Sequence, residues 1–300
     1  MSPAADAARS LRAPLPAGAG HGFVCTSDGL RLRWIAWGVP GAPPLVLLHG
    51  LRSYAATFAP LAERLSSSWR CLALDARGRG GSDHDPAGQY RTDRYVKDLK
   101  EFADQLDLSR FALLGHSMGG ATAMVFAAER PEAVRALVIE DMLPGSSRAG
   151  PGAERIRAEL SAIPERFASL DHARAYWRGL RPNASAEAIE SRVWHTIAPA
   201  GDGSTELSWI PDMAGIAAAR LDPRNPPIDL WPVIPRLPDP TLMIVGHESD
   251  FSPPATLQRV LSANPWVSAV SIAAAGHYVH DDQPELFNDA VAAFLAKARR

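Results

Sequence analysis

Ser117 has the sequence setting of a nucleophilic serine. It stands at the centre of Gly115-His116-Ser117-Met118-Gly119, after an apolar run at 111–114 and before small and apolar residues at 121–126. The strand, sharp turn and helix that these runs predict expose a serine hydroxyl at the tip of a strained turn, where side chains at the two glycine positions would collide. A serine hydroxyl is a poor nucleophile at neutral pH and needs a base beside it. We therefore predict that Ser117 is a nucleophile.

A histidine and a carboxylate that suit this serine lie later in the chain. The apolar run 241–245 is followed by a loop that contains Asp250, and the run 268–272 by a loop that contains His277. Open α/β sheets gather their functional side chains beyond the carboxyl ends of the strands. We predict that His277 takes the proton of Ser117 and that an acid orients the histidine ring.

Strand and helix patterns alternate through the first half of the chain. Two strand patterns, at 23–27 and 30–37, flank the hairpin signal Asp28-Gly29. Alternation of β and α patterns with continuous apolar strands favours an α/β fold, a mostly parallel, doubly wound sheet with helices on both faces. The other predicted strands are 45–48, 70–75, 111–114 and 135–140, and the predicted helices are 55–66, 92–107 and 118–129.

The composition excludes several classes of protein. The chain has 300 residues, of which 46% are hydrophobic and 21% charged, as in a globular domain with one main core. A formal net charge of −2 gives no electrostatic reason to bind nucleic acid or an anionic membrane, and no apolar run approaches the ~20 residues that span a bilayer. Cys25 and Cys71 imply no disulfide framework, so we expect a cytoplasmic protein. Residues 1–20 lack the apolar segment of a secretion signal and predict a disordered tail.

Four motifs in a fixed order give the chain a resemblance to the α/β-hydrolase superfamily over residues 21–298. Besides the serine motif, they are His49-Gly50-Leu51, Asp75-Ala-Arg-Gly-Arg-Gly-Gly-Ser82, and Gly276-His277 followed by Pro284-Glu285. The resemblance implies an eight-stranded sheet, with the hydrolase core at 21–141 and 239–300. It also implies an oxyanion hole made by the backbone N–H groups of Leu51 and Met118. No metal and no cofactor is expected.

The resemblance leaves two choices for the acid. Many relatives carry it three residues past the glycine that is Gly246 here, where this chain has Ser249 and then Asp250. Some relatives place it at the end of the sixth strand, where this chain has Asp141. We favour Asp250, because a G-x-x-S-D turn also occurs in the superfamily.

The alternation of β and α patterns breaks after Asp141. From residue 142 to about 240 no convincing buried strand is present, and helical stretches are predicted at 153–162, 165–179 and 185–197. The superfamily commonly inserts a helical cap at this point, so we expect a cap, or lid, at 142–238.

Three residues are candidates for binding the substrate. Half of the eight tryptophans lie in the expected cap, and we expect most of them to pack the cap against the core. Trp177 and Trp209 are the candidates to line an apolar pocket under the lid. Arg52, beside the oxyanion loop, is a candidate to bind a substrate carboxylate, with a surface role as the alternative.

These residues together predict a serine hydrolase that cleaves a carboxylic ester or related acyl bond of a small, largely apolar molecule through an acyl-enzyme. Serine at the elbow argues against dehalogenases and epoxide hydrolases, which need a carboxylate there. Other reactions remain alternatives: hydrolysis of a lactone, an amide or a C–C bond, removal of the amino-terminal residue of a peptide, and cofactor-free perhydrolysis. A receptor-like protein with little turnover is the alternative of another class. We expect a monomer or homodimer whose partner is a small-molecule substrate.

Overall fold

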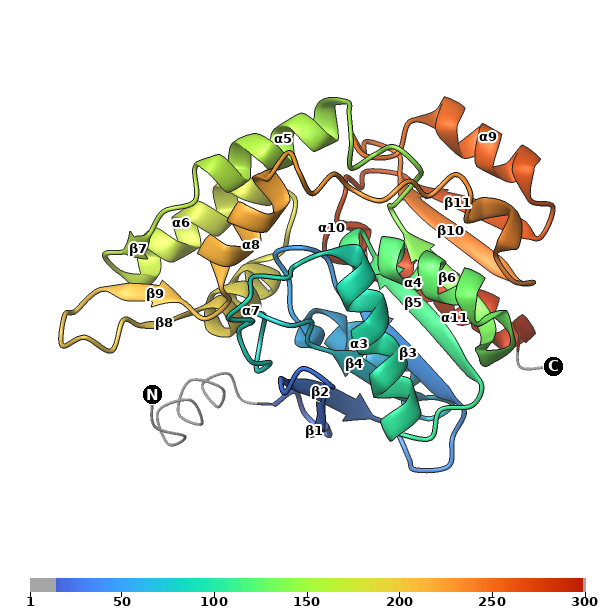
Figure 1. Cartoon of the computed structure of the whole chain (residues 1–300), viewed down its shortest axis with the longest axis horizontal. Coiled ribbons are helices and arrows are strands. Elements are labelled where there is room, and N and C mark those ends of the chain that lie inside the picture. Colours follow the sequence, from blue (N-terminus) through green and yellow to red (C-terminus); the bar gives the residue numbers. More distant parts are fainter. Residues whose placement is uncertain (1–14, 299–300) are drawn as a thin grey trace.

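An eight-stranded sheet forms the centre of the computed structural model, which describes residues 15–298 (Figure 1). The predicted tail at 1–20 lies largely outside these residues, and Gly20 already belongs to the first strand. The strand order is β1-β2-β4-β3-β5-β6-β10-β11, with parallel pairing from β4 to β11 and antiparallel pairing of β2 with both its neighbours. The predicted mostly parallel sheet is therefore confirmed. The strands are β1 (Gly20–Cys25), β2 (Arg31–Trp37), β3 (Pro44–Leu48), β4 (Arg70–Leu74), β5 (Phe111–His116), β6 (Val134–Glu140), β10 (Thr241–Gly246) and β11 (Val267–Ile272).

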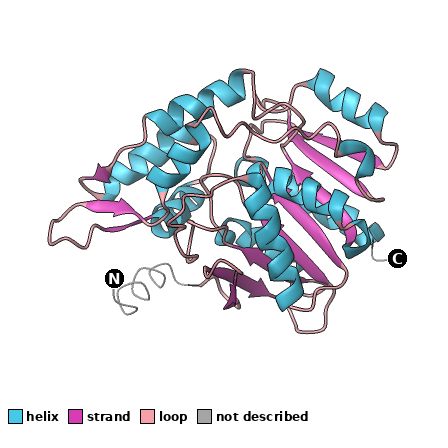
Figure 2. Cartoon of the chain, viewed as in Figure 1, coloured by secondary structure: helices cyan, strands magenta, loops and turns pink. Residues whose placement is uncertain are grey.

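Helices cover both faces of this sheet (Figure 2). Strand side chains alternate between the faces, so the core forms two apolar clusters. One contains Leu99 and Phe102 of α3 and more than half of α4, whose residues 119–128 are all buried. The other contains Leu61 of α2 and Phe287 of α11. The helices are α2 (Ala59–Leu65), α3 (Thr92–Gln105), α4 (Met118–Glu129), α9 (Pro254–Ala263), α10 (Val279–Asp282) and α11 (Pro284–Ala298), with short 3-10 turns η1 (Ala55–Phe58) and η2 (Pro131–Ala133).

The chain between β6 and β10 forms its own group of elements beside the sheet (Figure 1). Its three predicted helices are present, and the second begins at Leu170 because the Ser169 side chain caps it by accepting from the His172 N–H. A small sheet of order β7-β9-β8 and helix α8 were not predicted, because strands of two or three residues leave no readable period. The elements are α5 (Pro151–Ser161), β7 (Arg166–Phe167), α6 (Leu170–Leu180), α7 (Ala186–Thr196), β8 (Ile197–Pro199), β9 (Leu207–Trp209), α8 (Met213–Leu221) and the turn η3 (Ile234–Arg236).

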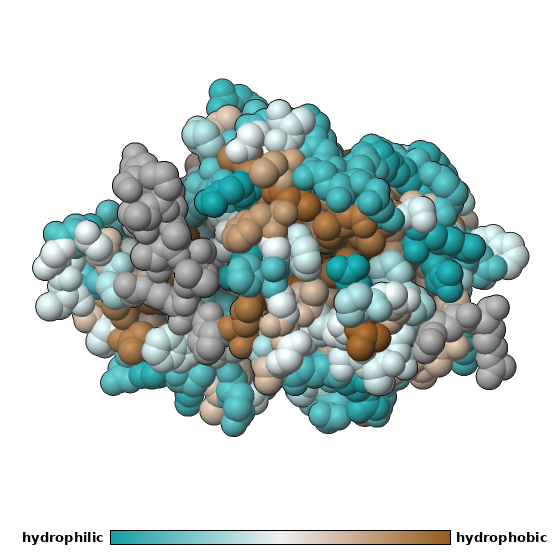
Figure 3. Space-filling view, turned by 90° about the horizontal axis from the view of Figure 1, so that it is seen from below, coloured by the Kyte–Doolittle hydropathy of each residue, from teal (hydrophilic) through white to brown (hydrophobic). Residues whose placement is uncertain are grey.

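The surface mixes polar and apolar side chains. Seen from below, apolar residues reach the surface near the middle of the molecule and hydrophilic residues border them (Figure 3). No helix within residues 15–298 is long and apolar enough to cross a membrane. Cys25 and Cys71 are both free thiols, as the absence of a disulfide framework predicts.

Candidate active site

Ser117 occupies a strained turn between β5 and α4. Its φ of 52° and ψ of −116° are a backbone conformation that residues with a side chain rarely adopt. The turn is held because the Ser117 N–H donates to the Glu140 carbonyl at 2.9 Å. A Cβ atom on Gly115 would lie 2.3 Å from the Gly119 carbonyl oxygen, and one on Gly119 would lie 2.2 Å from that of Leu48. The glycines are therefore required by close approach, as predicted.

Ser117 begins a chain of buried hydrogen-bonding groups. Its Oγ lies 2.9 Å from Nε2 of His277, and Nδ1 of His277 lies 2.7 Å from Oδ2 of Asp141. A carboxylate on Nδ1 fixes the ring tautomer that leaves Nε2 free to accept the serine proton. This arrangement can activate a serine hydroxyl as a nucleophile.

Asp141, at the end of β6, is the carboxylate behind His277. Its Oδ1 accepts from the Gly246 N–H at 3.1 Å, and its Oδ2 accepts from the Ser249 hydroxyl at 2.5 Å. Ser249 stands three residues past Gly246, and its side chain is turned toward Asp141. The position that carries the acid in many relatives thus supplies a hydroxyl that supports an acid from another strand.

Asp250 lies in a different ion pair. Its carboxylate accepts from Nε and Nη2 of Arg155 on α5, at 2.7 and 2.8 Å. These hydrogen bonds outweigh partial burial and lower the pKa of Asp250 below its usual value. The prediction that Asp250 lies behind His277 is therefore wrong, and the alternative, Asp141, takes that place.

The loop after β3 is fixed beside Ser117 by His49 and Arg79. Nδ1 of His49 donates to the Gly50 carbonyl at 2.8 Å, and its Nε2 accepts from the Ala76 N–H at 3.1 Å. Burial lowers the pKa of His49 to about 4, so the ring is neutral, as this pattern of one donor and one acceptor requires. Nε of Arg79 donates to the Leu51 carbonyl at 3.1 Å.

Leu51 and Met118 both border the cavity that contains Ser117. Met118 is the first residue of α4, where a backbone N–H has no intrahelical acceptor. Within residues 15–298 the N–H groups of Leu51 and Met118 donate no hydrogen bond. Both N–H groups can thus donate a hydrogen bond to an oxygen atom of a molecule bound beside the Ser117 hydroxyl.

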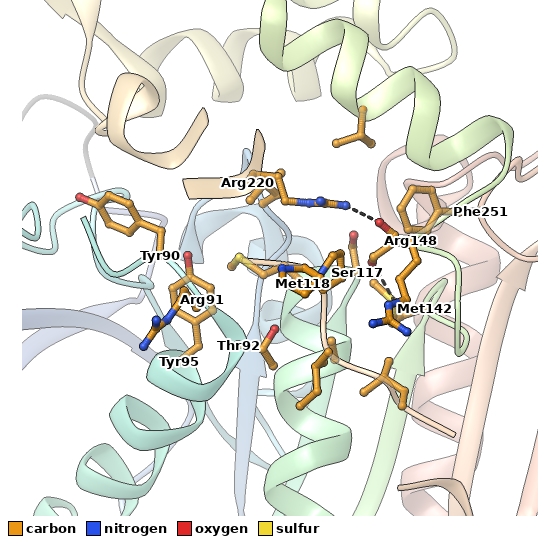
Figure 4. A pocket seen from close by; sticks show the side chains of 18 of the residues that line it. Tyr90, Arg91, Thr92, Tyr95, Ser117, Met118, Met142, Arg148, Arg220 and Phe251 are labelled. Carbon is orange, nitrogen blue, oxygen red and sulfur yellow. Dashed lines mark hydrogen bonds between the residues drawn. The ribbon is translucent and has the colours of Figure 1, made fainter. Parts of the chain in front are cut away.

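A cavity of about 310 Å³ opens over Ser117 (Figure 4). Helices α5 and α8 contribute Ile156 and Arg220 to its lining, and Ser117 lies near its middle. Most of the remaining lining is apolar, which suits the acyl part of a small molecule. The apolar residues include Met142, Leu143, Leu230 and Phe251.

The two predicted pocket tryptophans lie elsewhere. Trp177 is fully buried among Phe167 and Val193, and its Nε1–H donates to the Thr196 hydroxyl at 3.2 Å. Trp209 packs edge-to-face against Trp177 at 5.8 Å, and its Nε1–H donates to the Pro164 carbonyl at 2.8 Å. Neither residue lines the cavity, so their predicted role is wrong, because the small sheet turns Trp209 onto α6.

Arg52 is buried and does not lie on the surface. Its side chain is 1% exposed and forms an ion pair with Glu159 of α5. Nε and Nη1 of Arg52 have no hydrogen-bond acceptor within residues 15–298. Arg52 is not among the residues that line the 310 Å³ cavity, although its neighbour Leu51 is.

Other residues that support the site were not predicted. The Phe251 ring lies 4.3 Å from the His277 ring, and Nε2 of His116 donates to the His277 carbonyl at 2.9 Å. Burial, with repulsion from nearby histidines, keeps the pKa of His116 well below its usual value. Both residues adjoin a motif residue in sequence, which was the only available signal.

One buried group within the described residues has the composition of a metal site. Ligand atoms of His116, Glu140 and His280 lie within 4.8 Å of one another. Nδ1 of His280 lies 2.7 Å from Oε1 of Glu140, and its Nε2 lies 3.1 Å from the Thr57 hydroxyl. Burial lowers the pKa of His280, but the carboxylates of Glu140 and Asp281 together outweigh burial and raise that pKa above the usual value. A histidine whose two ring nitrogens both have partners is better described as part of a hydrogen-bonded support beneath Ser117.

Comparisons with known proteins agree with this geometry. The model of the alpha/beta hydrolase family matches residues 45–290. The chain is 30% identical to 2-(acetamidomethylene)succinate hydrolase of Mesorhizobium japonicum, over 85% of this chain and 89% of that protein. It is also 30% identical to the mouse sn-1-specific diacylglycerol lipase, over 85% of this chain and 81% of that protein. The crystal structure of E-2-(acetamidomethylene)succinate hydrolase superposes with a TM-score of 0.82 and 27% identity, covering 93% of this chain and 99% of that one. The chain is a hydrolase that belongs to the α/β hydrolase family.

Proposed function

We propose that the protein hydrolyses a carboxylic ester, or a related acyl bond, through an acyl-enzyme on Ser117. One observation carries this proposal: the buried hydrogen bonds from Ser117 to His277 and from His277 to Asp141 end in the cavity. A strained serine that has only a binding role would need no such partners.

The proposed reaction has two halves. His277 Nε2 takes the Ser117 proton while Oγ attacks the acyl carbon, and the imidazolium then gives this proton to the leaving group. Water, activated by His277 in the same way, releases the acid and restores Ser117. Asp141 stabilises the imidazolium and stays ionised.

The N–H groups of Leu51 and Met118 are the proposed oxyanion hole. Their freedom from other acceptors and their position at the cavity support this role. The amino-terminal end of α4 adds a favourable dipole for the negative charge that develops on the carbonyl oxygen. His49 and Arg79 hold the loop that carries Leu51, and Nη2 of Arg79 also lies 3.5 Å from Sδ of Met118.

We propose that residues 142–238 form a cap that selects the acyl group. Ile156 and Arg220 come from this segment and face the cavity that contains Ser117, which supports the assignment. The apolar lining favours an acyl chain of modest length.

An amide bond is the second candidate. The name of the Mesorhizobium relative places an acetamido group in its substrate, whereas the name of the mouse relative describes a lipase that acts on diacylglycerol, which is an ester. The same serine, histidine and acid serve both reactions, because both pass through a tetrahedral oxyanion.

Turnover of p-nitrophenyl acetate and of N-acetyl-p-nitroaniline tests both bonds. We expect a burst of p-nitrophenol from the ester and an acetylated Ser117 by mass spectrometry. Ser117→Ala and His277→Ala should each lower the rate by roughly 10⁴-fold or more, and the double variant should be no worse, because the residues act as a unit. Turnover of the ester near the wild-type rate by Ser117→Ala would refute the proposal. Faster cleavage of the anilide than of the ester would establish the amide instead.

A further inference from the structure

Three buried arginines lie together behind the cavity wall that Leu51 and Tyr278 form. We call Arg52, Arg181 and Arg192 the arginine cluster; each residue is at most 3% exposed. Arg181 lies over the Tyr278 ring, with its guanidinium carbon 3.5 Å from the ring centre, and donates to the Tyr278 hydroxyl. The guanidinium carbon of Arg192 is 5.4 Å from the centre of the same ring.

The charges in the arginine cluster are not balanced. Arg52 pairs with Glu159 and Arg192 with Asp281, but Arg181 forms no ion pair with any carboxylate in residues 15–298. Five buried nitrogen atoms also lack an acceptor in this range: Nε and Nη1 of Arg52, Nε and Nη1 of Arg192, and Nε of Arg181. Buried cationic donors without acceptors are costly, and folded proteins rarely keep them.

The positive charge of the arginine cluster lowers the pKa of the Tyr278 hydroxyl. Burial by itself raises the pKa of its hydroxyl, but the charges of the neighbouring arginines outweigh burial and bring the pKa below its usual value. Burial lowers the pKa of Arg181 to about 9, which still leaves the guanidinium charged at neutral pH. Tyr278 follows His277 and lines the cavity, whereas the three arginines do not, so the Tyr278 side chain is the contact between the arginine cluster and the cavity.

A hydroxyl without a partner lies in the same place. Tyr176 is near Arg52, whose charge opposes the rise in the Tyr176 pKa that burial causes. Its hydroxyl makes no hydrogen bond of normal geometry with any described residue. The Tyr176 oxygen can accept from the adjacent Arg52, and its hydroxyl hydrogen is then left to donate to an added acceptor.

We propose that Arg52 and Arg181, with the Tyr176 and Tyr278 hydroxyls, form a subsite for a carboxylate on the substrate. The substrate class is then an acyl compound that carries a second, ionised carboxyl group on its acyl part. A planar carboxylate fits the forked donors of a guanidinium and balances the excess positive charge. The identification of this group as substrate rests on the proposed function at Ser117.

Two other arginines are the rival location. Arg148 and Arg220 line the cavity itself, and neither forms an ion pair with a carboxylate in the described part of the chain (Figure 4). Arg148 is exposed, however, and Arg220 donates to the Ser147 carbonyl at 2.5 Å. They are therefore partly satisfied by solvent and backbone, in contrast to the arginine cluster.

Two esters with acyl chains of equal length test the proposal. Mono-p-nitrophenyl adipate and p-nitrophenyl hexanoate differ only in the terminal carboxylate. We expect wild type to favour the adipate by at least roughly tenfold in kcat/KM, the worth of one charge-assisted hydrogen bond. Arg52→Gln and Arg181→Gln should lower this preference by about 10- to 100-fold, and Tyr176→Phe, which keeps the ring packing, by several-fold.

Arg178→Gln is the matched control, because Arg178 lies on α6 near Arg181 but is exposed. It removes the same charge and should leave the preference unchanged. Arg220→Gln tests the rival location. Loss of the preference in Arg220→Gln alone would overturn the proposal, and so would a wild type that treats the two esters alike.

Binding separates this proposal from the one on Ser117. Adipate should raise the melting temperature of the Ser117→Ala protein more than hexanoate does, and Tyr176→Phe or Arg52→Gln in that background should reduce the difference. Adipate binding without turnover of any ester would refute the acyl-enzyme and keep the carboxylate subsite. Ester turnover would refute the subsite and keep the acyl-enzyme if wild type showed no kcat/KM preference for the adipate ester and adipate raised the melting temperature no more than hexanoate.

Discussion

Oδ2 of Asp141 lies 2.7 Å from Nδ1 of His277, although 136 residues separate them in the chain. The two strands that carry this pair to one edge of the sheet are β6, which ends just before Asp141, and β11, which precedes the His277 loop. Strand β10 lies between them and contributes the Gly246 N–H that fixes the carboxylate. The acid is thus held by a strand other than its own.

Asp141→Asn should lower kcat by on the order of 10³- to 10⁴-fold, because an amide behind Nδ1 stabilises the wrong ring tautomer. Asp250→Asn should cost at most a few-fold, since that carboxylate bonds to Arg155. Steady-state kinetics with a p-nitrophenyl ester compare the two variants directly. A larger loss in Asp250→Asn would return the acid to the loop after β10.

Gly119→Ala should destabilise the fold by roughly 1–3 kcal/mol and disturb the serine turn, because its Cβ would meet the Leu48 carbonyl oxygen. Gly179→Ala is the control, since Gly179 is also helical and a Cβ there meets nothing within 4 Å. That change should be neutral or stabilise by up to about 1 kcal/mol. Urea unfolding of both variants measures the difference, and equal effects would contradict the close approach.

The stability of the protein should fall as the pH drops below 6.5, in part through His49. Its folded pKa of about 4 lies below the ordinary value, so the unfolded chain binds more protons between these two pH values. The contribution is present above about pH 6.5 and falls by about 2 kcal/mol between pH 7 and pH 5. Urea unfolding at both pH values should show a smaller loss for His49→Gln than for wild type. Equal losses in the two proteins would mean that His49 does not titrate in this way.

Trp177→Ala should act on stability rather than on selectivity. Trp177 is fully buried outside the cavity, so its truncation should cost roughly 3–5 kcal/mol and leave the ratio of kcat/KM between short and long acyl esters unchanged. Ile156→Ala, which enlarges the cavity, should change that ratio by about tenfold. A change of ratio in Trp177→Ala with unchanged stability would place that tryptophan at the substrate.

The sequence by itself determined the sheet, the helices α2, α3 and α4 beside it, the serine turn and the loops that carry His49 and His277. Each of these rests on a local pattern: an apolar run for a buried strand, glycines beside Ser117, a histidine just past a strand. The structure confirms these elements because short-range sterics and burial decide them.

Only the tertiary structure decided which acid meets His277, where Trp177 and Trp209 pack, and whether Arg52 is exposed. Asp141 and Asp250 both follow strands that end at the same edge of the sheet, so the pattern cannot choose between them. The choice depends on Arg155, which comes from a helix in another part of the chain and forms an ion pair with Asp250. Such pairings are decided by the packing of segments far apart in sequence, and the local hydrophobic periodicity of the sequence does not predict them.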